Sequence, residues 1–222
     1  MKSISVVINA RLGSTRVKEK LVRPFASKSL IEIALEKLDV MDFFEHRYLA
    51  VAENRLKKIG GKYKNIEILD RNIDAVKPGV NDQKVTFAHY LGIPSDYIFV
   101  FNPCLPMITV DTIKKAFEYF QETDHTSYTS SIPTRDWIFD DNGNAITNSD
   151  PRNLTTNKGE TFHKAAHAFH IINRENLKKN GYHWTFTPND PHLIEIPEGE
   201  SIDVDEMLDF EFAEFAYKNK KI

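Results

Sequence analysis

The sequence predicts an α/β fold in which a mostly parallel β-sheet is flanked by helices. Strand-like apolar runs alternate with helix-like segments up to Gln121, as in parallel sheets whose strands are joined by crossover helices. Two of these runs, residues 3–9 and 97–101, become continuously apolar, as strands covered on both faces do. The length of 222 residues fits a single domain spanning residues 1–222.

The first elements repeat the order strand, loop, helix. A polar and basic loop at residues 10–24 follows the first strand, and Ser29 can then cap a helix. Apolar side chains between Leu30 and Leu38 recur at helical spacing and form the expected buried face of this helix. The next expected elements are a strand at 48–52, a short helix at 54–62 and a strand at 66–69.

Two further helices complete the regular part of the chain. Asp82 can cap a helix over residues 83–91, and Gly92 closes it. Thr109 can cap a helix over residues 110–121. The expected buried face of that second helix consists of Ile113, Ala116, Phe117 and Phe120.

The regular alternation ends after Ser131. Asn142-Gly143 favours a tight turn, so residues 137–146 are expected to form a β-hairpin, and residues 148–160 a polar loop. The remaining expected elements are strands at 166–172 and 192–196 and a closing helix at 206–218. We expect the segment 132–185 to be an insertion that shapes a substrate pocket or a dimer contact.

The composition excludes several classes of protein. Lys and Arg number 29 against 32 Asp and Glu, and this balance argues against a nucleic-acid binder. Hydrophobic residues make up 41% of the chain, which is typical of a globular protein and not of a disordered one. Cys104 is the single cysteine, so neither an internal disulfide nor a cysteine-based zinc site is expected. No run is long enough for a membrane span, and we expect a cytoplasmic protein with no membrane partner.

The loop after the first strand carries a distinctive set of polar groups. Residues 10–21, called the basic loop below, contain Arg11, Gly13, Ser14, Thr15, Arg16, Lys18 and Lys20. Open α/β sheets bind ligands at the carboxyl ends of their strands, which is where this loop begins. Glycine lets backbone N–H groups approach a phosphate, and Arg and Lys neutralise its oxygens. The pattern favours phosphate binding, and its alternative is an ordinary solvated basic loop.

Two carboxylates precede the last expected helix. Asp203 and Asp205 are two positions apart, so in an extended segment both side chains point the same way and can meet one cation. Mg²⁺ favours one or two carboxylates together with phosphate oxygens and water. The alternative is an acidic first turn in which Asp205 or Glu206 complements the helix dipole.

Polar residues also follow the most apolar strand. Asn102 lies where a strand-end side chain faces the ligand crevice, and Cys104 is interpreted as a small pocket or core residue. Among the histidines, His167 and His170 are expected to face opposite ways along an extended strand. These two and His163 are therefore not expected to form one metal triad, and their individual roles stay open.

These motifs together resemble a known family. The segment ARLGSTRVKEKL (10–21) is similar to the signature of acylneuraminate (CMP-sialic acid synthetase-like) cytidylyltransferases, which include legionaminate and pseudaminate enzymes and, more distantly, CMP-Kdo synthetases. The resemblance continues in residues 69–71, 101–106, 168–171 and 201–214, and so covers nearly the whole chain in order.

The resemblance implies a Rossmann-like nucleotidyltransferase fold, usually a homodimer, and a Mg²⁺-dependent reaction. In that reaction a sugar acid and CTP give a CMP-sugar and pyrophosphate. The residues that the resemblance implies for CTP are Arg11, Gly13, Ser14, Arg16 and Lys20 around the triphosphate, and Asn9, Ala10 and Arg71 near the cytosine and ribose. Arg11, Arg16 and Lys20 are the implied catalytic residues. Asp203 and Asp205 would bind Mg²⁺, and Asn102, Lys164, His167 and Phe169 would line the acceptor pocket.

The chain also departs from the sialate enzymes on the acceptor side. Those enzymes typically carry a lysine at the position of Thr15, and a Gln-Pro-Thr-Ser-Pro-Leu-Arg type of segment where this chain has residues 102–108. We therefore expect a cytidylyltransferase for an acidic sugar or a related anionic acceptor whose identity stays open. The alternatives are transfer to a sugar 1-phosphate or other phosphorylated acceptor, with CTP or another NTP, and a non-catalytic nucleotide sensor.

Overall fold

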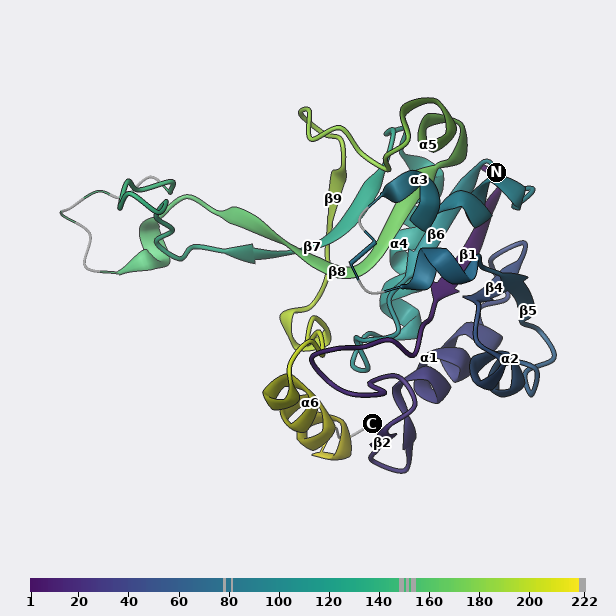
Figure 1. Cartoon of the computed structure of the whole chain (residues 1–222). Coiled ribbons are helices and arrows are strands. Elements are labelled where there is room, and N and C mark those ends of the chain that lie inside the picture. Colours follow the sequence, from purple (N-terminus) through teal and green to yellow (C-terminus); the bar gives the residue numbers. More distant parts are fainter. Residues whose placement is uncertain (78, 81, 148–149, 151, 153–154, 220–222) are drawn as a thin grey trace.

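A seven-stranded β-sheet forms the centre of the molecule (Figure 1). The computed structural model describes the chain except for residues 78, 81, 148–149, 151, 153–154 and 220–222. The strands are, in spatial order, β5 (Glu67–Asp70), β4 (Arg47–Val51), β1 (Ile4–Asn9), β6 (Tyr97–Phe101), β8 (Phe162–Asn173), β7 (Tyr128–Thr134) and β9 (His192–Glu195). Of these seven strands only β8 runs antiparallel to its neighbours, which confirms the prediction of a mostly parallel sheet.

Helices cover both faces of the sheet. The α-helices are α1 (Leu30–Asp39), α2 (Asn54–Gly60), α3 (Gln83–Thr86), α4 (Val110–Glu122), α5 (Arg174–Asn180) and α6 (Met207–Asn219). In the larger apolar core, α1 and α4 pack against one face of the sheet. A smaller core on the other face includes Tyr90, from the 3₁₀ segment 88–92, and Leu177, from α5. Four short 3₁₀ segments, 73–76, 88–92, 156–158 and 198–200, and the ribbon of β2 (Pro24–Phe25) with β3 (Lys28–Ser29) complete the fold.

The expected helix starts are confirmed in detail. Ser29 caps α1, and its backbone N–H donates to Glu32 Oε2 over 3.0 Å. Thr109 caps α4, and its Oγ1 accepts the backbone N–H of Thr112 over 3.1 Å. No helix in the described part of the chain is both long and apolar enough to cross a membrane.

The prediction of a single helix over residues 83–91 is wrong. The structure divides it into α3 and a 3₁₀ segment at 88–92, with Phe87 in a non-helical conformation between them. Tyr90 is fully buried in the smaller core and its hydroxyl bonds the side chain of Asn9. These tertiary contacts outweigh the local preference for one continuous helix.

β8 is longer than the expected strand 166–172 and contains an irregularity. His167 has a φ of 54°, and the pairing with β7 shifts register between Thr129 and Ser131. Ser130 Oγ accepts the backbone N–H groups of Ala168 over 2.9 Å and Phe169 over 3.2 Å, so it satisfies the donors that the bulge exposes. β7 itself was not expected from the sequence.

The bulge also overturns the expected placement of two histidines. In a regular strand, the side chains of His167 and His170 would lie on opposite faces. The left-handed backbone at His167 instead brings the two rings to a centroid distance of 5.5 Å. The two imidazoles therefore lie together.

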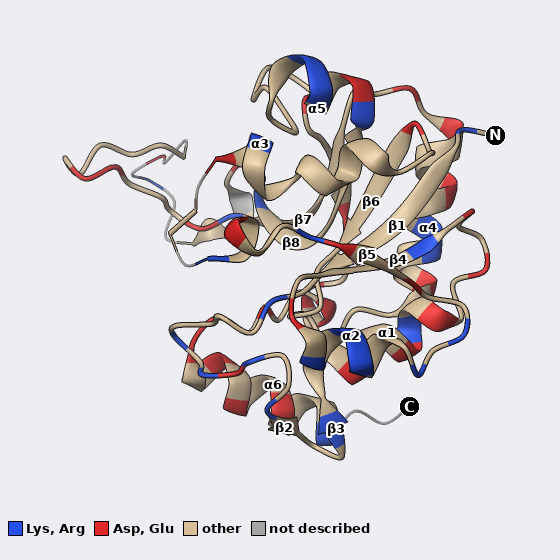
Figure 2. Ribbon diagram, turned by 45° about the vertical axis from the view of Figure 1, so that its right-hand side comes forward, with Lys and Arg blue, Asp and Glu red and all other residues tan. Residues whose placement is uncertain are grey.

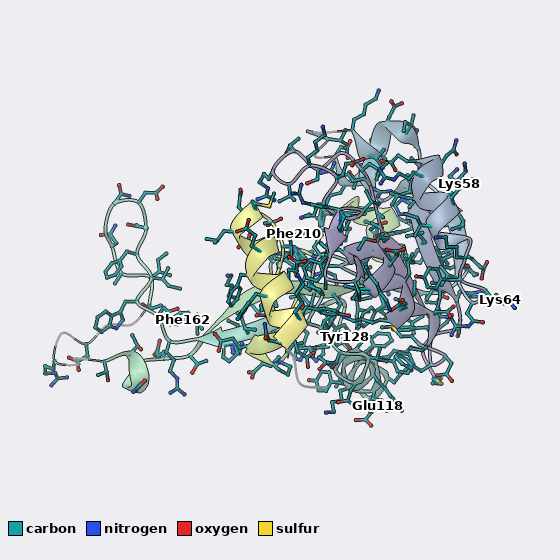
Figure 3. All side chains as sticks on the ribbon, turned by 90° about the horizontal axis from the view of Figure 1, so that it is seen from below. Lys58, Lys64, Glu118, Tyr128, Phe162 and Phe210 are labelled. Carbon is teal, nitrogen blue, oxygen red and sulfur yellow. The ribbon has the colours of Figure 1, made fainter. Side chains whose placement is uncertain are left out.

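β7 and β8 continue beyond the sheet as a two-stranded ribbon. Thr134 pairs with Phe162 at its far end, and the described residues among 135–161, called the arm below, project from the body (Figures 1 and 3). Within the arm, Phe139 pairs with Ala145 across a turn at Gly143, which confirms the expected hairpin. The projecting part is narrower than the expected insertion 132–185, because most of β8 lies inside the sheet. The polar loop expected at 148–160 lies partly outside the described residues.

The C-terminal helix α6 packs against residues 25–26 near the start of the chain. The rings of Phe25 and Phe210 pack with centroids 5.2 Å apart, and the Ala26 N–H donates to Glu214 Oε1 over 2.7 Å. Figure 1 accordingly shows α6 beside β2. This packing places residues 203–205, which lead into α6, next to the basic loop.

Candidate active site

A cavity of about 250 Å³ opens where β1 and β6 end. Its lining residues are Asn9, Arg11, Ser14, Thr15, Arg16, Lys20, Leu21, Asn102, Pro103, Cys104 and Asp205. Asn9 ends β1, and the other lining residues come from the basic loop, from the segment after β6 and from the segment before α6. The three stretches that the sequence singled out therefore meet at the carboxyl edge of the sheet, where open α/β folds bind ligands.

The basic loop contacts the acidic segment directly. Arg16 Nη2 donates to Asp205 Oδ1 over 2.7 Å, and Lys20 Nζ lies 3.4 Å from the same oxygen. Lys20 also donates to the carbonyl of Val204, and only 13% of its side chain is exposed. Figure 2 shows blue and red ribbon segments side by side where the basic loop passes α6. Cations and carboxylates that are far apart in sequence thus share one site.

Lys18 differs from the other cations of the basic loop. Its side chain is exposed, and it lines a separate surface hollow with Arg23 and Arg55. It is absent from the residues that line the cavity. Of the four cations that the sequence pattern grouped together, only Arg11, Arg16 and Lys20 therefore reach the site.

Asp203 is the buried member of the carboxylate pair. Burial, reinforced by the negative charge of Asp205, raises the pKa of Asp203 to about 6. Its Oδ1 is buried and has no hydrogen-bond partner among the described residues. Such an oxygen suits a cation as its missing partner. No group of three or more His, Cys, Asp or Glu side chains in the described ranges is arranged to hold a metal.

The acidic helix start has an identified capping residue. Asp209 Oδ2 accepts the backbone N–H groups of Asp205 over 3.1 Å and Glu206 over 2.7 Å. The first turn of α6 is thus stabilised by Asp209. Asp209 thus supplies the capping contacts, and the alternative in which Asp205 or Glu206 complements the helix dipole is compatible with their position directly before α6.

Asn9 belongs to a hydrogen-bonded group behind the cavity wall. Its Oδ1 lies 2.9 Å from His89 Nε2, and its Nδ2 donates to the hydroxyl of Tyr90. Burial, together with the positive charge of Arg71, lowers the pKa of His89 to about 3. Sequence reasoning missed His89 and Tyr90, because their positions inside an expected helix carried no signal of a site.

Arg71 and Glu53 lie at the same edge of the sheet. Arg71 is 9% exposed, and burial lowers its pKa. Glu53 Oε1 accepts the Leu12 N–H over 2.8 Å and so fixes the start of the basic loop. Arg71 Nε and Glu53 Oε2 are buried without hydrogen-bond partners among the described residues. Glu53 was not singled out from the sequence, although its place two residues after the end of β4 is a usable signal.

The remaining residues expected around the nucleotide lie in the first turn after β1. Ala10 is buried and donates its N–H to the carbonyl of Ala50 over 3.1 Å. Gly13 lies between Leu12 and Ser14, and the N–H of Ser14 donates to the Leu12 carbonyl over 2.8 Å. Both residues shape the backbone from which the cavity side chains project.

Of the four expected acceptor residues, Asn102 and His167 lie near the cavity. Asn102 lines it and donates from Nδ2 to the His167 carbonyl over 3.0 Å. Lys164 is exposed on β8, where it pairs with Ile132 near the arm. Phe169 is fully buried against Phe99, with ring centroids 4.8 Å apart. The expectation that Phe169 lines an open pocket is corrected: its side chain belongs to the core.

Comparisons with known proteins agree with this geometry. A cytidylyltransferase family model matches residues 5–188. Post-translational flagellin modification protein B of Campylobacter coli is 24% identical over an alignment that covers 100% of this chain and 98% of that protein. The 3-deoxy-manno-octulosonate cytidylyltransferase of Rickettsia felis is 28% identical over 140 residues, 59% of this chain and 52% of that enzyme. The match thus spans about half the length of the Rickettsia enzyme.

Solved structures share the fold. CMP:2-keto-3-deoxy-manno-octonic acid synthetase complexed with CTP superposes with a TM-score of 0.69 at 12% identity, over 98% of this chain and 99% of that one. The 4-diphosphocytidyl-2C-methyl-D-erythritol synthase of Anaerococcus prevotii gives a TM-score of 0.68 at 14% identity, over 98% and 97%. The fold is therefore the Rossmann-like nucleotidyltransferase fold. The chain belongs to the cytidylyltransferase family.

Proposed function

We propose that this protein transfers CMP from CTP to an acidic sugar, or to a related anionic acceptor, and releases pyrophosphate. The observation that carries the proposal is the meeting of Arg11, Arg16 and Lys20 with Asp205 at one cavity. Family membership and relatives named for 3-deoxy-manno-octulosonate transfer and flagellin modification support the class of reaction.

The chain's own residues supply charge neutralisation and alignment. Phosphoryl transfer asks little covalent chemistry of a protein, so its catalysts mainly orient the reactants and stabilise charge. Arg11, Arg16 and Lys20 would hold the triphosphate and neutralise the pyrophosphate as it leaves. Ser14 and the backbone around Gly13 would add hydrogen bonds to phosphate oxygens.

The acceptor oxygen must lie in line with the leaving pyrophosphate. Asn102 and His167 are on the β6–β8 side of the cavity, where we propose that the acceptor binds, whereas the exposed Lys164 lies farther along β8, toward the arm. No residue needs to form a covalent intermediate. Burial raises the pKa of the Cys104 thiol to about 11, so this cavity residue is a poor nucleophile near neutral pH.

We propose Mg²⁺ as the metal of the reaction. Asp203 and Asp205 would hold it, because their carboxylates are two residues apart and the buried Asp203 Oδ1 has no hydrogen-bond partner in the described part of the chain. When bound, a divalent cation draws charge from phosphate oxygens. Asp205 is paired with Arg16 and Lys20 in this structure, so metal and nucleotide would rearrange these contacts together.

We also propose a homodimer located in the cytoplasm, where CTP is supplied. The arm exposes large apolar side chains that its own chain does not cover: Trp137, Ile138, Phe139 and Ile146 are 38–60% exposed. Exposed apolar side chains gathered on one projection mark an interaction surface. A second copy of the chain is the partner that the family resemblance implies.

The test is pyrophosphate release by the full chain with Mg²⁺, across CTP, UTP, GTP and ATP. Each nucleotide is paired with a panel of sialic, legionaminic, pseudaminic and other acidic sugars, and with sugar 1-phosphates. Release with CTP and an acidic sugar is expected. Release only with a phosphorylated acceptor would favour the alternative transferase. CTP binding that ignores Mg²⁺ and gives no release with any acceptor would instead indicate a nucleotide sensor.

A further inference from the structure

Asn9 is held from two sides by residues from a distant part of the chain. His89 Nε2 lies 2.9 Å from Asn9 Oδ1, and the Tyr90 hydroxyl accepts from Asn9 Nδ2. These three residues are called the Asn9 network. Tyr90 is fully buried, whereas Asn9 lines the cavity. The network therefore connects the interior of the protein with the wall of the site.

Counting partners among the described residues, these two contacts leave Asn9 one donor and one acceptor for a ligand. A carboxamide has two N–H groups and an oxygen with two lone pairs. His89 occupies one lone pair and Tyr90 occupies one N–H. The groups that remain, an acceptor beside a donor, complement a 4-aminopyrimidine, whose amino group donates and whose ring N3 accepts. A 4-oxopyrimidine offers the reverse pattern.

A carboxamide that is free to turn presents either pattern equally well. With Asn9 Oδ1 facing His89 Nε2, that nitrogen must carry the proton and donate, because a carboxamide oxygen only accepts, and the Tyr90 hydroxyl accepts from Asn9 Nδ2. His89 is neutral near pH 7, because burial and Arg71 lower its pKa to about 3, so one ring nitrogen carries the proton. Reversing Asn9 would require that proton to move to the other ring nitrogen.

The composition of the cavity places a nucleobase at Asn9. Arg11, Arg16 and Lys20 form the cationic part that suits a triphosphate. Asn102, the second carboxamide of the cavity, already uses both of its polar ends: Nδ2 donates to the His167 carbonyl and Oδ1 accepts the Cys104 N–H over 2.9 Å. By the same count Asn102 also keeps one N–H and one lone pair, but it is bonded to the His167 carbonyl on the β8 side of the cavity, where the acceptor is proposed to bind, so the base is assigned to Asn9 at the end of β1.

We propose that His89 and Tyr90 are positioning residues that fix the Asn9 carboxamide, so that the cavity selects a 4-aminopyrimidine nucleotide over a 4-oxopyrimidine nucleotide. This inference rests on the proposed use of CTP and adds the residues that set the choice of base. With the triphosphate held by Arg11, Arg16 and Lys20 as proposed above, a wrong base would be unable to shift sideways to restore its hydrogen bonds. A buried polar group left unpaired is what makes such discrimination strong.

The experiment compares CTP with UTP in full-length variants. The ratio of kcat/KM for CTP over UTP, and the ratio of the two dissociation constants from calorimetry, are measured for the unmodified protein, His89→Leu and Tyr90→Phe. Both ratios are expected to fall about tenfold or more in each variant. His89→Gln retains a side-chain N–H donor and is expected to recover part of the ratio. Phe87→Leu, which alters the ring stacked on Tyr90 at 5.2 Å, is the matched control and should leave both ratios unchanged.

Tyr90→Phe removes a single oxygen and keeps the buried ring, so this variant is expected to fold. Thermal melting of each variant checks that it does. Folded variants whose CTP-to-UTP ratios equal those of the unmodified protein overturn the inference. The inference is also overturned if the CTP-to-UTP ratios of Phe87→Leu fall as far as those of Tyr90→Phe, because packing around Tyr90 would then explain the effect. Absence of CTP turnover in the unmodified protein overturns the proposed function instead, and the calorimetric ratio then decides the inference alone.

Discussion

Glu19 is the strained residue of the basic loop. Its φ of 55° lies in the left-handed region, which costs an L side chain about 1 kcal/mol. Its carboxylate pairs with Arg55 over 2.6 Å at the surface. Glu19→Gly and Glu19→Ala both remove this pair, so the difference between them isolates the backbone strain. We expect the Gly variant to be more stable by about 1 kcal/mol in denaturant unfolding, whereas equal stabilities would show that no strain is present.

Asp190 makes a buried hydrogen-bonded contact outside the site. Burial raises the pKa of Asp190, but hydrogen bonds from Ser127 and Thr185 outweigh this effect and hold it below the ordinary value. A lowered folded-state pKa gives stability that is present above the unfolded value of about 4 and is lost as pH falls. Asp190→Ala should therefore lower the free energy of unfolding by about 1–3 kcal/mol at pH 7. Denaturant titrations that show an equal loss at pH 3 would contradict this assignment.

Site residues could be predicted from the sequence where they are neighbours along the chain. Arg11, Ser14, Arg16 and Lys20 lie on one loop directly after a strand, so a general rule about sheet edges located them. His89 reaches Asn9 only through the tertiary fold, 80 positions away in sequence. No local pattern marks such a contact, and the sequence offered no reason to choose this histidine over the others.

Among the elements, β8 shows what periodicity misses. Two adjacent serines of β7, Ser130 and Ser131, are both fully buried, yet they differ in role. Ser130 Oγ accepts two N–H groups at the bulge, whereas Ser131 Oγ is a buried atom with no partner among the described residues. Ser130→Ala should lower the free energy of unfolding by about 1–3 kcal/mol. Ser131→Ala, which removes an unsatisfied group, should be neutral or stabilising.

Equal losses in the two serine variants, measured by chemical denaturation, would refute the bulge-stabilising role of Ser130.

The elements that the sequence predicted well, such as β1, α1 and α4, carry regular apolar spacing and capping residues. The bulge at His167 and the break at Phe87 depend on buried partners from other elements. Local patterns do not contain that information.

At the scale of the whole molecule, the apolar arm predicts self-association. Trp137 and Phe139 are 45% and 55% exposed on a ribbon that leaves the body, so replacing both with Ser removes apolar surface without opening the core. We expect this double variant to raise the dimer dissociation constant at least about tenfold in analytical ultracentrifugation. Its melting temperature at concentrations where both proteins are monomeric should be unchanged. A monomeric unmodified protein at high concentration would contradict the dimer.

The central claim is that a triphosphate is held by cations of the basic loop that reach the cavity. Lys20 and Lys18 carry the same charge two positions apart, but only Lys20 lines the cavity. The most direct measurement is kcat/KM for CTP in Lys20→Met and Lys18→Met, followed by pyrophosphate release. Lys20→Met should lose about 10²–10³-fold, and Lys18→Met should stay within about twofold of the unmodified protein. Equal effects of the two substitutions, or full activity of a folded Lys20→Met variant, would contradict the claim.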